Sequence, residues 1–198
     1  MWNQEKINEY KNVFDLTNNL IGKQISQLLF FLDDEDIAYN EQENIYGKSL
    51  LNGVEIVCAN EKYYLGNFFF KTHYNGLNIK KGNLTDFEFI ENKKPQNYPS
   101  KFLNETIIDA KIYWRRSFLG KCFVPIDITF ETDKHFILFS SIEINFGEVS
   151  LELTDELLVI EDKLIAEKLS LGEFGIEKNG RIFFRNIEEI IEAEKSID

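Results

Sequence analysis

Apolar and polar residues alternate with a period of two along most of the chain between Ile25 and Phe139. Successive side chains of a β-strand point to opposite faces of a sheet, so this alternation predicts a body of antiparallel β-sheet. The clearest strand is Ile126–Glu131, with three apolar side chains on one face and three polar ones on the other, and it is expected to be half-buried. Its expected partner is Phe136–Phe139, which follows the polar turn Thr132–His135.

Short polar segments between the apolar runs predict hairpin turns. Ala59–Lys62 separates Val54–Cys58 from Tyr63–Leu65 and has the length and polarity of such a turn. An Asn-Gly pair adopts positive φ at little cost, as the tight type I′ turn requires. We expect a hairpin at each of the three pairs of this kind, which are Asn52-Gly53, Asn75-Gly76 and Asn179-Gly180.

Helices are expected to be few and peripheral. The strongest signal predicts a helix over Ile187–Lys195, because Asn186 is a good N-cap, a glutamate stands at the capping-box position and the isoleucines share one face. A second helix is predicted over Lys163–Leu169 with Asp162 as its cap, and a third between Glu5 and Leu20. The expected fold class is therefore α+β, mostly antiparallel β, with few peripheral helices.

The two halves of the chain resemble each other in their apolar pattern. Leu20–Phe31 aligns with Leu103–Trp114 without a gap, and Val54–Leu65 aligns with Ile126–Ile137 with the acidic residue and the lysine of the turn in register. The blocks keep their order along the chain. This pattern predicts a degenerate internal duplication, and chance similarity between generic hairpins is the alternative.

The domain organisation follows from this comparison. We expect a single domain over 1–198, in which the β-rich repeats 20–92 and 103–162 pack together on either side of a linker at Glu91–Ser100 that contains two prolines. A hairpin and helix over 174–195 are expected to close the chain. Hydrophobic residues make up 43% of the sequence, which is enough apolar area to build such a core.

The 198 residues carry a formal net charge of −12. This charge repels phosphate backbones and anionic lipid, so nucleic acid and membrane surfaces are not expected as partners, whereas a basic protein would be attracted. Half of the 34 acidic residues fall in Asp33–Glu43, Glu148–Asp162 and Asn186–Asp198. We interpret these stretches as a partner-facing acidic patch, with a solvated surface as the alternative, and the candidate contact residues are Asp33, Asp34 and Asp36.

Localisation is predicted from what the sequence lacks. No apolar run approaches the ~20 residues that span a bilayer, and the first residues have no basic and apolar regions of a signal peptide. The two cysteines, Cys58 and Cys122, each lie in an apolar stretch and do not form the framework typical of secreted proteins. We expect a cytoplasmic protein with both thiols reduced.

No residue pattern points to catalysis. The chain has two histidines and no nucleophile elbow, and a Cys122–His135 pair would place its cysteine in what reads as a buried strand. Carboxylates such as Asp127 and Glu143 have no feature that marks them as an acid and base pair. We expect no catalytic residue and no cofactor, while a hydrolase without a recognisable motif stays open as an alternative.

Metal sites are not predicted either. The acidic run that begins at Asp33 invites a calcium interpretation, but an EF-hand loop needs glycine at its sixth position and glutamate at its twelfth. Ala38 and Asn44 occupy those positions here, and the cysteines and histidines have no zinc-ligand spacing.

One local cluster differs from its surroundings, namely Trp114-Arg115-Arg116. An arginine stacks on aromatic rings and grips carboxylates with two hydrogen bonds, so these residues are candidates for an anchor that contacts a partner. The alternative is a strand end whose arginines extend along the surface into water.

The pattern of Val124–Phe130, a polar turn and Phe136–Glu143 resembles one met in small uncharacterised bacterial proteins, some of toxin-immunity type. The resemblance implies an acidic cytoplasmic binder that neutralises a basic toxin domain by occupying its active site, and it carries over no functional residue. We therefore expect a non-catalytic protein-binding module. A small-ligand-binding or structural protein is the alternative.

Overall fold

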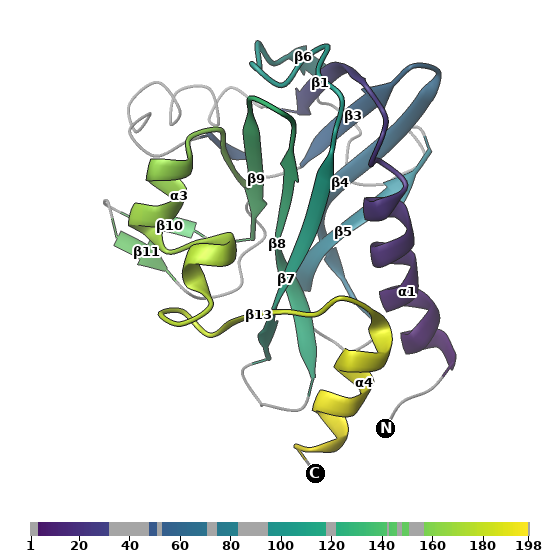
Figure 1. The fold of residues 1–198 in the computed structure, drawn as a ribbon, viewed down its shortest axis with the longest axis vertical. Helices are drawn as coiled ribbons and strands as arrows, with labels where there is room; N and C mark the ends of the chain where they lie inside the picture. The colour runs from purple at the N-terminus through teal and green to yellow at the C-terminus, as the bar shows by residue number, and fades with distance from the viewer. Residues whose placement is uncertain are drawn as a thin grey trace.

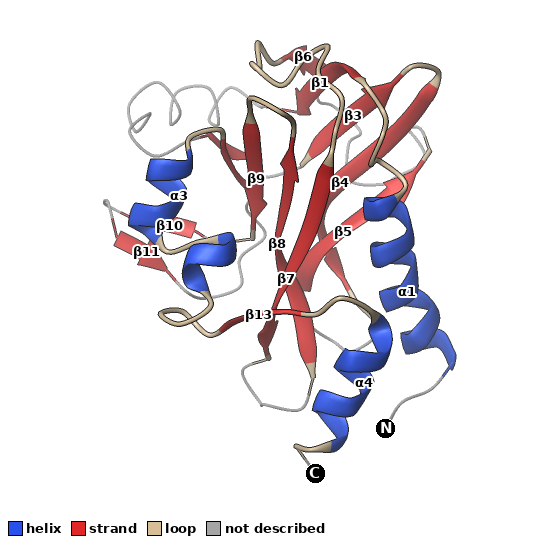
Figure 2. Cartoon of the chain, in the orientation of Figure 1, coloured by secondary structure: helices blue, strands red, loops and turns tan. Residues whose placement is uncertain are grey.

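A computed structural model of the protein describes residues 4–31, 48–50, 53–70, 75–82, 95–117, 122–141, 143–145, 148–150 and 157–197. These residues form two main antiparallel sheets and a separate two-stranded ribbon, with helices on the outside (Figures 1 and 2). The mostly β, α+β fold class predicted from the alternating pattern is confirmed. No helix of the described residues is long and apolar enough to cross a lipid bilayer.

The first sheet has five strands in the order β5-β4-β3-β1-β6. Its strands are β1 (Ile25–Phe31), β3 (Val54–Cys58), β4 (Glu61–Phe69), β5 (Asn75–Lys81) and β6 (Pro95–Asn97). The hairpin predicted between the third and fourth strands is confirmed, and its turn is the pair Ala59-Asn60, with Ala59 at a φ of 53°. The predicted linker at Glu91–Ser100 is in part a strand, because β6 pairs with β1.

The second sheet has six strands in the order β13-β7-β8-β9-β12-β2. Its strands are β2 (Lys48–Leu50), β7 (Asp109–Arg116), β8 (Phe123–Glu131), β9 (Phe136–Ser140), β12 (Leu157–Ile160) and β13 (Arg181–Phe183), and β10 (Glu143–Asn145) pairs with β11 (Glu148–Ser150) apart from it. The predicted β8–β9 hairpin is confirmed.

The helices are α1 (Gln4–Asn18), α3 (Lys163–Leu169) and α4 (Ile187–Lys195), with a 3-10 turn η3 (Gly172–Gly175) after α3. All three predicted helices are thus confirmed. Their local signals act as expected, since Asn186 Oδ1 accepts a hydrogen bond from Glu189 N at 3.0 Å and Asp162 Oδ1 accepts one from Leu164 N at 2.8 Å.

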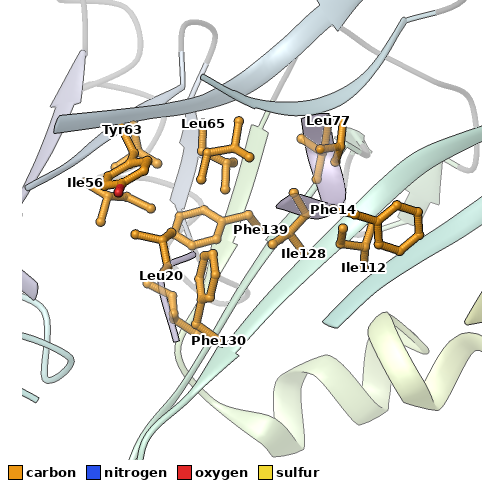
Figure 3. Close-up of a cluster of buried hydrophobic side chains, with 14 of the residues drawn as sticks. Phe14, Leu20, Ile56, Tyr63, Leu65, Leu77, Ile112, Ile128, Phe130 and Phe139 are labelled. Atoms are coloured by element: carbon orange, nitrogen blue, oxygen red, sulfur yellow. The ribbon is translucent and has the colours of Figure 1, made fainter. Parts of the chain in front are cut away.

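The main core lies between the two sheets (Figure 3). Ile56 and Leu65 face it from the five-stranded sheet, and Ile128 and Phe139 face it from the six-stranded sheet. Phe14 of α1 packs on the same cluster. Burial of this apolar area, at about 25 cal/mol per Å², is the main force that holds the sheets face to face.

The other face of the six-stranded sheet, which we call the outer face, is covered by α3 and η3. Leu138 of β9 and Leu158 of β12 pack there against Ala166 and Leu169 of α3. As a result, every residue of β8 but the last is buried. The half-buried strand predicted over Ile126–Glu131 is therefore wrong, because a segment distant in sequence covers its polar face.

Two of the three predicted Asn-Gly hairpins are also wrong. The strand before Asn52-Gly53 belongs to the six-stranded sheet and the strand after it to the five-stranded sheet, so no hairpin joins them. Asn179-Gly180 follows η3, and β13 pairs with β7, so the expected C-terminal hairpin is a single strand followed by a helix. The third predicted hairpin is present, since β4 pairs with β5, but Asn75 and Gly76 pair with Phe69 and Phe68 within the strands, so the prediction that this pair forms the turn is wrong.

The two predicted repeats contribute most of their strands to different sheets, although β2 of the first repeat joins the six-stranded sheet. Strands β1, β3 and β4 of the first are consecutive neighbours, as are β7, β8 and β9 of the second. The segments before β1 and β7 pair antiparallel, since Gly22 N donates to Ile107 O at 2.8 Å and Ile107 N donates to Lys23 O at 3.0 Å. An internal duplication around a pseudo-twofold axis would produce this arrangement, and the duplication itself stays a prediction.

Candidate functional site

A buried ion pair lies at the centre of the outer face. The Asp127 carboxylate of β8 is fully buried and pairs with Nε of Arg181 on β13, whose side chain is also buried. Ser140 Oγ donates a hydrogen bond to Asp127 Oδ1, and the backbone N of Gly172 donates one to Oδ2 at 2.8 Å. A buried carboxylate is costly unless it is paired, so these contacts hold η3 and β13 against the sheet.

The path of the Arg181 side chain depends on a glycine. A Cβ atom at position 175 would lie 2.2 Å from Cδ of Arg181 and 2.4 Å from the carbonyl oxygen of Ser170. Glycine at this position therefore lets the arginine pass close to η3 and reach Asp127. Because both partners are shielded from solvent, this pair serves the fold and offers no access to a substrate.

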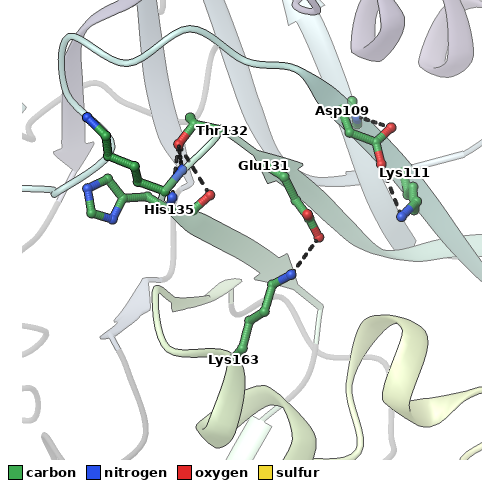
Figure 4. Close-up of polar contacts among 8 residues, drawn as sticks. Asp109, Lys111, Glu131, Thr132, His135 and Lys163 are labelled. Carbon is green, nitrogen blue, oxygen red and sulfur yellow. Dashed lines mark hydrogen bonds and ion pairs between the residues drawn. The ribbon is translucent and has the colours of Figure 1, made fainter.

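A row of charged side chains lies on the same face near the β8–β9 turn (Figure 4). Asp109 and Lys111 are two residues apart on β7 and so share a face, and Asp109 is the cross-strand neighbour of Glu131. Lys111 Nζ lies 3.0 Å from Asp109 Oδ2, and Lys163 Nζ of α3 lies 3.1 Å from Glu131 Oε1. Local pairing thus offsets much of the charge along this row.

Tyr113 continues the row on β7 and brings an aromatic surface to it. Its ring centroid is 5.8 Å from that of Phe183, its cross-strand neighbour on β13. Tyr113 is buried, but Phe183 is 39% exposed. Burial raises the pKa of Tyr113, and the charges of Glu173, Asp127 and other carboxylates raise it further, so the phenol is neutral and lies in a negative potential.

An open groove of about 510 Å³ lies at the β8–β9 end of the same face. It is lined by acidic and basic side chains in similar number, among them Lys101, Asp133 and Lys163. His135 is positioned here because Thr132 Oγ1 accepts hydrogen bonds from the backbone N atoms of residues 134 and 135, at 3.2 Å and 2.9 Å. Such a lining suits a charged ligand better than an apolar one.

This position of His135 rules out the Cys122–His135 pair. Cys122 immediately precedes β8 and His135 follows its far end, so the strand separates them by roughly 30 Å at about 3.3 Å per residue. The side chains of Cys122 and Cys58 are both buried. Burial raises the pKa of Cys58 to about 11, which leaves this thiol protonated and unreactive at neutral pH.

A second cavity of about 410 Å³ lies on the five-stranded sheet beside Cys58. Glu61 borders it and accepts hydrogen bonds from Lys23, Lys81 and the Tyr63 hydroxyl, the last at 2.9 Å. Hydrogen bonds from Lys23, then from Lys81 and Tyr63, lower the pKa of Glu61 to about 2. The charged and hydroxyl groups of this network already form hydrogen bonds with one another, so few of their donors and acceptors are left for a ligand.

The structure separates the three residues of the predicted anchor. Trp114 is fully buried, and its ring lies 5.1 Å from the ring of Tyr10 and 5.4 Å from that of Phe14. Its prediction as a partner-contacting residue is therefore wrong, because it points into the core. Arg115 is partly exposed and Arg116 is exposed, so their contact with a partner stays a prediction.

The predicted acidic patch is only partly visible. Asp33, Asp34 and Asp36 lie outside the described residues. Of the other two acidic stretches, one reaches α3 and the other forms α4, which lie on different sides of the molecule in Figure 1. Glu194 of α4 is not a surface charge, since its Oε2 lies 2.5 Å from the buried Lys6 Nζ and its Oε1 accepts a hydrogen bond from Phe123 N at 2.8 Å.

The sequence interpretation missed three of the residues that matter most on the outer face, namely Glu173, Arg181 and Phe183. A signal existed for the buried pair, because Asp127 is an acidic residue inside an apolar strand and needs a cationic partner. Nothing local identifies that partner as Arg181, which is 54 residues away. Among the described residues, no group of three or more histidine, cysteine, aspartate or glutamate side chains is placed to hold a metal ion.

The chain matches no protein-family model, no curated protein and no solved structure. The functional argument therefore depends on the chemistry of the outer face.

Proposed function

We propose that the protein is a non-catalytic binding module whose partner is a basic protein. The observation that carries this proposal is the gathering of carboxylates on the outer face, where Asp109, Glu131 and Glu173 all act on Lys111 and Tyr113. The hydrogen bond that Lys111 donates to Asp109 raises the pKa of Lys111, and the charges of Glu131 and Glu173 add to this effect. A face with this potential, on a chain of net charge −12, attracts cations.

The exposed apolar side chains on this side of the molecule also support protein binding. Leu164 of α3 is 73% exposed, Ile176 after η3 is 44% exposed, and Phe183 is the exposed aromatic of β13. Protein interfaces combine apolar anchors with a polar rim, and the anchors contribute most of the affinity. Charges around them mainly accelerate association.

A finer form of this proposal is an immunity-type protein that neutralises a basic toxin domain. It depends on the resemblance of residues 124–143 to small bacterial proteins, some of that type. The described part of this segment forms β8 and β9, which are covered on both faces. The resemblance therefore concerns the core of the fold, and the contact surface must be identified by experiment.

The alternative function is the binding of a small charged ligand in the groove at the β8–β9 turn. Its volume of about 510 Å³ is within the range of small-molecule sites, and Lys101 and Asp133 make no hydrogen bond or ion pair within the described chain. A metabolite that co-purifies with the protein would favour this function over protein binding.

The test of the proposed function is capture of a partner from the native host, followed by binding kinetics at low and moderate salt. We expect a basic partner whose association rate exceeds the ~10⁵–10⁶ M⁻¹s⁻¹ of uncharged pairs and falls as salt is added. An acidic partner, or an association rate that ignores salt, would show that the proposal is wrong.

A further inference from the structure

Phe183 and the η3 turn that carries Glu173 both lie beside the buried ring of Tyr113. Phe183 faces Tyr113 across the β13–β7 pair, and η3 packs against both of these strands. A Cβ atom at Gly172 would lie 3.6 Å from Cε2 of Tyr113, so the chain passes the tyrosine ring immediately before Glu173. An exposed aromatic ring and a carboxylate are thus presented together beside Tyr113.

Glu173 differs from its acidic neighbours because it forms no ion pair within the described part of the chain. Asp109 is paired with Lys111, Glu131 with Lys163, and Asp127 with Arg181. The side chain of Glu173 is exposed and makes no hydrogen bond or ion pair with any residue of the described chain. The balance of charges around Tyr113 therefore leaves one carboxylate that a further cation would neutralise.

We propose that this place binds one cationic side chain of the basic partner, with the cation over the Phe183 ring and hydrogen-bonded to the Glu173 carboxylate. This inference rests on the proposed function and names the site at which the partner is recognised. Arginine fits best, because its planar guanidinium stacks on an aromatic face and donates two parallel hydrogen bonds to a carboxylate. Lysine, a compact charge, would bind more weakly.

The probe for this site is the capped tripeptide tri-arginine, titrated into the ¹⁵N-labelled protein and followed by NMR. We expect the amide signals of Gly172 and Phe183 to shift and to report a local dissociation constant. Glu173→Gln removes the charge at constant shape, and Phe183→Leu keeps apolar bulk without an aromatic face. Each change is expected to weaken local binding about threefold, and tri-lysine is expected to bind less tightly than tri-arginine.

Glu177→Gln is the matched control, because it removes another exposed carboxylate a few residues along the same segment. It makes the net charge less negative by the same one unit and is expected to leave the local dissociation constant unchanged. Both test side chains are at the surface, so unchanged far-UV circular dichroism is expected of all three variants.

Three outcomes would overturn the inference: no shift at these amides, equal binding by the two test variants and the wild type, or an equal loss with Glu177→Gln. If the captured basic partner still binds with its salt dependence in Glu173→Gln and Phe183→Leu, the proposed function stands and the site lies elsewhere. If no basic partner is captured at all, the proposed function fails whatever the peptide does.

Discussion

Glu61 shows how strongly neighbouring groups can stabilise the ionised form of a single carboxylate at the protein surface. Its side chain is about one-third exposed, yet two lysines and a tyrosine hydroxyl donate hydrogen bonds to it. These donors stabilise the ionised carboxylate and lower its pKa from the ordinary 4.5 to about 2. The position therefore makes folding stability depend on pH.

We expect this dependence between about pH 4.5 and about pH 2. A carboxyl whose pKa is lower in the folded state contributes stability above its unfolded pKa and loses it as the pH falls through its folded pKa. Urea unfolding of the wild type and Glu61→Gln should therefore differ by a constant amount above pH 5 and converge toward pH 2. Glu177→Gln is the control, and a gap between Glu61→Gln and wild type that is unchanged down to pH 2 would contradict the prediction.

At the scale of elements, the turn of the β3–β4 hairpin places a residue in a backbone conformation that it adopts only at a cost. Its two-residue turn places Ala59 at a φ of 53°, a left-handed conformation in which the Cβ of an L-residue crowds the following carbonyl oxygen. Asn60 is the other turn residue and does not have positive φ. The long strand pairing on both sides maintains the turn despite this cost.

Ala59→Gly is therefore expected to raise the free energy of unfolding by about 1 kcal/mol, because glycine adopts positive φ without the Cβ contact. The matched variant Asn60→Gly gains nothing at its position and only adds freedom to the unfolded chain, so it should lower stability slightly. Urea denaturation of the two variants beside the wild type measures both effects. Equal or opposite changes would show that the left-handed turn is not strained.

At the scale of the whole molecule, the Asp127–Arg181 pair joins the C-terminal segment to the middle of the six-stranded sheet. The two residues are 54 positions apart and both are buried. Within the described chain, Nη1 and Nη2 of Arg181 make no hydrogen bond, so Asp127 supplies all of its pairing. Loss of the carboxylate charge would leave a buried guanidinium with no counter-charge.

Asp127→Asn is therefore expected to lower the free energy of unfolding by about 3–5 kcal/mol. Adding Arg181→Met should restore part of that loss, because the unpaired charge is then removed as well. Glu131→Gln breaks the partly exposed pair with Lys163 and should cost about 1 kcal/mol or less. If Asp127→Asn costs no more than this control in urea unfolding, the buried pair does not stabilise the C-terminal segment.

Several elements follow from local chemistry and were predicted from sequence. Two of the three helices, α3 and α4, are capped by the side chains of Asp162 and Asn186 without help from the rest of the chain. The β3–β4 and β8–β9 hairpins follow from alternation on both sides of a short polar segment. These signals act over a few residues, and that short range is why one sequence reveals them.

Other features depend on which segments meet in space. Alternation along β7 predicts that successive side chains point to opposite faces of the sheet, but it does not predict which face is buried. Trp114 lies in the core because its face of β7 packs against α1. The alternation in β8 predicts a solvent-exposed polar face, but α3 and η3 cover this face in the structure. Asn52-Gly53 predicts a hairpin turn, but its flanking strands belong to different sheets. The site beside Tyr113 combines β7, which ends at Arg116, with η3 and β13, which begin only at Gly172 and Arg181. The free energy of burial and strand pairing between such segments depends on both segments together. Neither segment therefore carries a sequence pattern that predicts the contact on its own.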